Sequence, residues 1–225
     1  MALILSIETA TTNCSVSLSK AGETLAVIED YNKGFSHAER LHSFIETILN
    51  ENAVAASQIA AVAISKGPGS YTGLRIGVSA AKGLCFALNI PLISVSTLEA
   101  LAHQVKTQEG FIISMLDARR MEVYAEVYNA NYQSVRGIKA EVLDANSYKE
   151  FLDKSPVHFI GNGVEKTKAC IRHKNAVFIE NKLPSANEMG AIAFNKYKKS
   201  DFEDVAYFEP YYLKDFVAIK PKSIL

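Results

Sequence analysis

The strongest constraint on the fold is an order of strand and helix patterns that occurs twice along the 225 residues. In each half, three strand patterns precede a helix, a further strand and a second helix. In the first half the strands are expected at 2–8, 14–19, 24–31 and 59–65, and the helices at 36–52 and 74–89. The order restarts at residue 111, without matching letters between the halves. The sequence therefore predicts an α/β chain of duplicated βββαβα units.

Two lobes are expected from this repeat, one over residues 1–108 and one over residues 109–225, with the last residues free to pack back on the first lobe. A strand at 91–95 and a helix at 97–107 complete the first half, and a helix near 146–154 belongs to the second. Two ribonuclease H-like lobes that face each other are the architecture of the actin-like, sugar-kinase and Hsp70-like ATPases. This is an analogy of fold, and fold alone does not establish activity.

The turns that join the first two strands of each half lack the glycines of a phosphate clamp. In actin-like ATPases these turns combine an acidic residue with glycines, because a bare backbone lets amide groups approach the phosphates. The residues that remain in such positions here are Glu8, Thr9, Thr11, Asp117 and Arg119. Arg119 and Arg120 are interpreted as solvated or interface side chains, with direct contact to a phosphate as the weaker alternative. We therefore expect no ATP hydrolysis by this chain alone.

A glycine-rich segment, GPGSYTG at 67–73, lies between a predicted strand and a predicted helix. Backbone amides at a helix N-terminus favour anions, but the GK[ST] ending of a P-loop is missing. Its candidate partner-binding or anion-binding residues are Gly67, Gly69, Ser70, Gly73 and Arg75. The alternative, weighed about equally, is that the glycines and Pro68 form a tight turn that only packs the helix against the sheet.

The helix expected at 74–89 carries small residues at helical spacing, namely Gly77, Ala80 or Ala81, and Ala87. Small residues let a second helix approach closely. A glycine inside a helix costs up to about 1 kcal/mol relative to alanine, so some packing gain should compensate. Either a partner helix or the sheet of this chain could provide that gain, and both are compatible with different faces of the helix.

Residue types for metal or nucleophilic chemistry do not cluster in the sequence. His37 and His42 are five residues apart, which places them about 140° apart around a helix, whereas two ligands of one metal favour the i, i+4 spacing. The other histidines stand alone, and no Gly-x-Ser-x-Gly elbow occurs. The sequence therefore predicts no metal site and no catalytic nucleophile.

Charge and cysteine content indicate which partners and which cellular compartment suit the chain. Lys plus Arg equals Asp plus Glu at 24 each, so no global positive field favours tight binding of a polyanion by this chain alone. The three cysteines, Cys14, Cys85 and Cys170, form no CxxC pair, which fits a reducing cytoplasm. No uncharged apolar run reaches the roughly 18 to 20 residues of a membrane span. Neither secretion nor membrane insertion is expected.

Four segments together resemble the TsaB family, also called YeaZ, along almost the whole chain. They are ILSIETATTNCSVSL at 4–18, SKGPGSYTGLRIGVSAAKGL at 65–84, DARRMEVY at 117–124 and EPYYLKD at 209–215. GPGSYTGLRIG is the most specific element, whereas ETAT or DAR alone would be weak. The resemblance implies an actin-like fold without the metal and nucleotide catalysis of the related TsaD.

The resemblance also implies a function and partners. TsaB-type chains act with the catalytic TsaD and the ATPase TsaE, which handle ATP and threonylcarbamoyl-adenylate, in threonylcarbamoyl transfer to the adenosine adjacent to the anticodon of tRNA. On this reading the chain is a non-catalytic scaffold that binds no cofactor tightly, contacts tRNA only through the complex and forms a homodimer when alone. Partner contacts are implied for helices 37–52 and 74–89, with Leu41, Phe44 and Ile45 as further candidates.

Two other classes of function stay open at the level of the sequence. The first is an independent hydrolase, either an ATPase or a glycoprotease-like metallopeptidase. The second is a small-ligand or anion-binding module that uses the turn at 67–73.

Overall fold

The first sheet has the order β3-β2-β1-β4-β5. The computed structural model describes residues 2–31 and 37–214. The strands of this sheet are β1 (Leu3–Glu8), β2 (Cys14–Lys20), β3 (Glu23–Asp30), β4 (Ala61–Ser65) and β5 (Leu92–Val95). β1, β2 and β3 are antiparallel neighbours, while β4 is parallel to β1 and β5 to β4.

The second sheet repeats this topology with the order β10-β9-β6-β7-β8. Its strands are β6 (Phe111–Asp117), β7 (Glu122–Asn129), β8 (Ser134–Val142), β9 (Val157–Ile160) and β10 (Ala176–Ile179). The predicted two-lobed actin-like α/β fold with a duplicated unit is confirmed.

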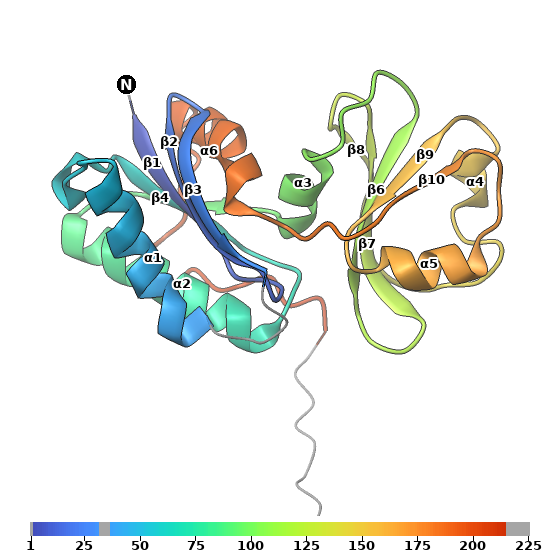
Figure 1. Cartoon of the computed structure of the whole chain (residues 1–225), viewed down its shortest axis with the longest axis horizontal. Coiled ribbons are helices and arrows are strands. Elements are labelled where there is room, and N and C mark those ends of the chain that lie inside the picture. Colours follow the sequence, from blue (N-terminus) through green and yellow to red (C-terminus); the bar gives the residue numbers. More distant parts are fainter. Residues whose placement is uncertain (1, 32–36, 215–225) are drawn as a thin grey trace, which may run out of the picture.

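Helices cover both faces of the first sheet (Figure 1). α1 (His37–Glu51) and α2 (Tyr71–Leu88) pack on one face against Leu5 and Ile7, while α6 (Met189–Lys198) packs on the other against Ile4. Because side chains alternate along a strand, neighbouring residues of β1 enter different cores. We call this sheet with α1, α2 and α6 lobe one.

The second sheet is covered by short helices and forms lobe two. α4 (Lys149–Leu152) and α5 (Val164–Cys170) pack on one face, and α3 (Thr97–Ala102) packs on the other through Leu98 and Leu101. Two 3₁₀ turns, η1 (Ala56–Gln58) and η2 (Ala186–Glu188), complete the elements. Each half of the sequence therefore contributes one helix to the sheet of the other half, α3 to the second and α6 to the first.

Several predicted helix boundaries differ from the structure. α2 begins at Tyr71 rather than at residue 74, because the Ser70 side chain caps it by accepting a hydrogen bond from the Gly73 amide at 3.3 Å. The helix expected over 97–107 ends at Ala102, and that near 146–154 covers only Lys149–Leu152. The helix expected at 36–52 is observed as α1 (His37–Glu51), and its predicted first residue lies outside the described residues.

Candidate functional site

The first strand-joining turn is closed by bonds within the chain. Glu8 is fully buried, and its Oε1 accepts hydrogen bonds from the Ala10 amide at 2.6 Å and the Ser65 hydroxyl at 2.8 Å. Burial raises the pKa of the Glu8 carboxyl to about 7. The Thr9 hydroxyl donates to the Gly73 carbonyl at 2.8 Å. Both polar side chains are therefore directed into lobe one.

The glycine-rich segment packs directly on this turn. The Ser70 amide donates to the Ala10 carbonyl at 2.7 Å. A Cβ atom at Gly69 would lie 2.5 Å from that carbonyl oxygen, and one at Gly73 would lie 2.2 Å from the Thr9 carbonyl oxygen. Gly67 has a φ of 105°. These glycines are required for packing, and the amides of Ser70 and Gly73 are already occupied by the chain.

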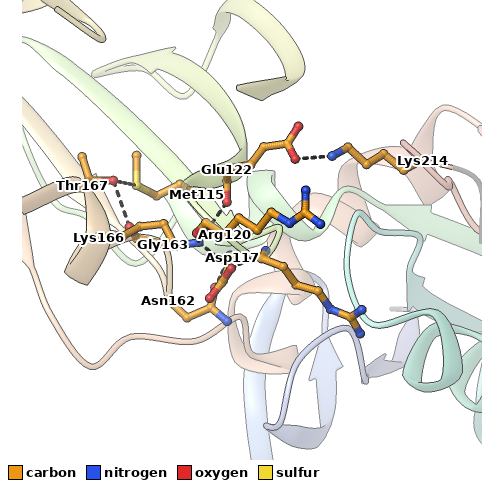
Figure 2. Close-up of polar contacts among 10 residues, drawn as sticks. Met115, Asp117, Arg120, Glu122, Asn162, Gly163, Lys166, Thr167 and Lys214 are labelled. Atoms are coloured by element: carbon orange, nitrogen blue, oxygen red, sulfur yellow. Dashed lines mark hydrogen bonds and ion pairs between the residues drawn. The ribbon is translucent and has the colours of Figure 1, made fainter. Parts of the chain in front are cut away.

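The second strand-joining turn holds its acid in an ion pair (Figure 2). Asp117 Oδ1 accepts a hydrogen bond from the Arg119 amide at 2.6 Å and contacts Lys166 Nζ at 2.7 Å. Arg119 and Arg120 take φ values of 70° and 49°, the left-handed region that glycine adopts most easily. The turn has the backbone shape of a glycine turn but presents two arginine side chains.

The two turns meet across a cleft of about 490 Å³ between the lobes. Its lining includes Thr11, Gly69, Ser70, Asp117 and Arg119, so the structure brings these five candidates together. Glu8 and Thr9 are buried behind it. With one carboxyl sequestered and the other paired with a lysine, the cleft presents hydroxyls and a guanidinium rather than an ionised pair of acids.

The histidines of α1 point in different directions. His37 is buried, and its Nε2 donates to the Thr11 carbonyl at 2.7 Å, since a carbonyl can only accept. Burial lowers the pKa of His37. His42 is exposed. Within residues 2–31 and 37–214, no three His, Cys, Asp or Glu side chains cluster as a metal site would require.

A second concave surface of about 570 Å³ lies between α1 and α2. We call it the α1–α2 groove, and it is lined by Ala38, His42, Arg75, Ile76, Ser79, Ala80, Gly83 and Leu84. A Cβ atom at Gly83 would meet no heavy atom within 4 Å. The groove is therefore open at Gly83, and its lining combines apolar and small residues with His42 and Arg75. Ala87 is exposed on the same helix.

Other interface candidates from the sequence face the core of this chain. Leu41 and Ile45 are 0% and 6% exposed, and Phe44 is partly buried against the same core. A Cβ atom at Gly77 would lie 2.2 Å from Thr9 Oγ1, so this glycine serves packing inside lobe one. These residues therefore pack inside lobe one, and contact of these positions with a partner stays a prediction.

Two residues on the α1 side of the groove, Ala38 and His42, were not among the interface candidates expected from the sequence. Ala38 and His42 are four residues apart and therefore share one helix face, which borders the apolar stripe. The four-residue spacing can be seen in the sequence, but an alanine and a histidine at this spacing are equally typical of a helix face that contacts only solvent.

Comparisons with known proteins agree on one lineage. The family model described as TsaD, tRNA N6-adenosine threonylcarbamoyltransferase, matches residues 34–222. The tRNA threonylcarbamoyladenosine biosynthesis protein TsaB of Escherichia coli K12 is 31% identical over 225 residues, 96% of each chain. TsaB of Bacillus subtilis is 34% identical over 175 residues, 75% of this chain and 74% of that protein.

A solved structure matches along the same length. YeaZ from Pseudomonas aeruginosa superposes with a TM-score of 0.81 at 27% identity, over 95% of this chain and 100% of that chain. In the part of the chain that the structure describes, no helix combines the length and apolarity needed to cross a membrane.

Proposed function

Because the chain belongs to the TsaB family of tRNA threonylcarbamoyladenosine biosynthesis proteins, we propose that it is a non-catalytic subunit that docks a TsaD-type catalytic subunit on the α1–α2 groove. The observation that carries the proposal is the open groove of about 570 Å³ on the outer side of two long helices. Small residues such as Ala80 and Gly83 let a partner helix approach closely.

The state of the two strand-joining turns supports a non-catalytic role. Glu8 is buried, and Asp117 Oδ1 is paired with Lys166, so the two turns do not present the pair of unpaired carboxylates that would position a metal-bound phosphate and a water. On this proposal the chain binds no cofactor tightly. ATP and threonylcarbamoyl-adenylate are handled by the TsaD-type and TsaE-type partners.

The same groove is proposed to bind two different partners in turn. A second copy of this chain occupies the groove when the protein is alone, and the TsaD-type chain replaces it in the complex. Transfer RNA is contacted only through that complex, in the cytoplasm. The balanced charge of the chain, 24 basic and 24 acidic side chains, supports this indirect route.

Reconstitution of tRNA modification with and without this chain tests whether the chain is required, and Gly83→Leu tests whether the α1–α2 groove is the docking surface. The larger side chain meets open space within the chain but fills the groove, so the variant should fold and lose docking and tRNA modification. Complex formation is measured by analytical ultracentrifugation and modification by threonylcarbamoyl transfer to tRNA. The matched control is Gly137→Leu on β8, where a Cβ atom also meets nothing within 4 Å.

Two outcomes would contradict the proposal. One is full modification without this chain or with Gly83→Leu. The other is hydrolysis of ATP or peptide by the purified chain, with stoichiometric metal, which would favour the independent hydrolase.

A further inference from the structure

Residues 203–214 run from α6 back along lobe one, and we call this segment the strap. It begins with Glu203, which pairs with Leu92 of the edge strand β5 and accepts a hydrogen bond from the Ser94 hydroxyl. Lys82 of α2 then donates to the carbonyls of Ala206 at 3.0 Å and Phe208 at 3.1 Å. The first part of the strap is thus held by backbone and side-chain bonds to lobe one.

The second part of the strap crosses the N-terminal end of α2. The Tyr211 amide donates to the Lys66 carbonyl at 2.7 Å. The Tyr212 ring lies 5.0 Å from the Tyr71 ring, and the Arg75 guanidinium lies 4.2 Å from the centre of the Tyr71 ring. Through these contacts the strap packs beside the glycine-rich segment. Residues 211–214 of the strap then form part of the lining of the interlobe cleft.

The strap ends on lobe two. Lys214 Nζ forms an ion pair with the carboxylate of Glu122, the first residue of β7 (Figure 2). This pair joins a segment anchored on lobe one to the hairpin that carries Asp117 and Arg119. It is partly exposed, with 44% of the Lys214 side chain and 21% of the Glu122 side chain accessible.

The lobes are also joined by an apolar contact. There α3 packs on the second sheet through Leu98, Leu101 and Ala102, all fully buried. In Figure 1, α3 lies between the two lobes, and the end of the strap lies below it. The apolar contact at α3 is costly to break, whereas the partly exposed Lys214–Glu122 ion pair breaks at little cost. Loss of the ion pair would therefore leave α3 as the point about which the lobes can move.

We propose that the strap is a latch across the interlobe cleft, in which the Lys214–Glu122 ion pair holds lobe two against lobe one and its loss lets the cleft open about α3. The device belongs to the free chain and does not depend on the proposed docking surface.

The test measures the distance between the lobes by double electron–electron resonance in the full-length free chain. Spin labels are placed at the exposed positions of Glu39→Cys on α1 and Glu165→Cys on α5, in a Cys170→Ser background. Cys14 and Cys85 are buried, and burial raises the pKa of both thiols to about 11, so they stay unlabelled.

Lys214→Met removes the charge but keeps the aliphatic stem, and it should raise the population at the longer interlobe distance about two- to five-fold at low ionic strength. About 1 M sodium chloride should open the wild type to the same degree and leave the variant unchanged, because salt screens an exposed pair. Glu122→Gln should match Lys214→Met, and the double variant should open no further than either.

Lys214→Arg, which keeps the charge, and Lys199→Ala, at an exposed position at the end of α6, should retain the wild-type distances. Thermal melting by circular dichroism verifies that each variant is folded. The latch is refuted if Lys214→Met or Glu122→Gln leaves the distance distribution unchanged, or if the two substitutions have additive effects.

Discussion

At the scale of single residues, Glu8 shows how a catalytic-looking acid can be used for structure. It ends β1 at the position where an actin-like ATPase would place a functional carboxylate, yet it is fully buried and holds the first turn closed. Burial raises its pKa from 4.5 to about 7. The folded chain therefore binds this proton more tightly than the unfolded chain does, and the carboxyl stabilises the fold best when it is neutral.

This pKa predicts a specific dependence of stability on pH. The contribution of Glu8 is fully present below about pH 4.5 and is lost as the pH rises through about 7, with a total of about 3 kcal/mol. Glu8→Gln mimics the neutral acid and should lack this loss. Urea denaturation of both proteins from about pH 4.5 to about pH 8 should show the variant gaining on the wild type.

Parallel pH profiles of the two proteins would mean that Glu8 is ionised at no cost in the folded chain. Ser65→Ala is a useful companion, because it removes a hydrogen bond that lowers the Glu8 pKa and should therefore move the loss of stability to higher pH.

At the scale of elements, α2 uses its two internal glycines for different purposes. Gly77 and Gly83 are six residues apart and so lie on different sides of the helix. A Cβ atom at Gly77 would collide with Thr9 Oγ1 at 2.2 Å, whereas one at Gly83 would meet nothing within 4 Å. One glycine brings the helix close to the first turn, and the other leaves the α1–α2 groove open.

Alanine at these two positions should therefore have opposite effects on stability. Gly83→Ala should stabilise the chain by up to about 1 kcal/mol, because alanine is the better helix former. Gly77→Ala has the same intrinsic gain but should destabilise by about 1–3 kcal/mol through overpacking. Chemical denaturation measures both, and a stabilised Gly77→Ala would show that Thr9 moves aside freely.

At the scale of the whole molecule, the lobes exchange helices. α6 comes late in the sequence but covers the first sheet, where Met189 and Ala193 join one core with Ile4 and Ile93. The small serines of β2 make room on the same face, since Ser15 and Ser17 bond the backbone of Ala186 at 2.8 Å and 2.6 Å. The core of lobe one is therefore completed only by α6, which comes late in the sequence.

Met189→Ala should test this dependence. Met189 is fully buried, so the substitution should lower the free energy of unfolding by about 2–5 kcal/mol. Hydrogen exchange should show the loss of protection in β1 and β5 rather than in β6, although Met189 follows lobe two in the sequence. Lys199→Ala, at an exposed site just beyond the end of α6, is the control and should leave both quantities unchanged.

Much of the fold and of the candidate site follows from local patterns in the sequence. The alternation in Cys14–Lys20 predicts a strand, and the spacing of Leu41 and Ile45 predicts a helix, because period and residue type act over a few neighbours. The lack of glycine in both strand-joining turns was readable in the same way, and so was the resemblance to one family.

Only the tertiary structure decided which face of each element meets which neighbour. Periodicity shows that Leu41 and Ile45 share a helix face, but not that this face meets the sheet while Ala38 and His42 border the groove. The exchange of α3 and α6, and the ion pair of Lys214 with Glu122, join residues far apart in the sequence. Such contacts depend on the path of the whole chain, and no local pattern encodes that path.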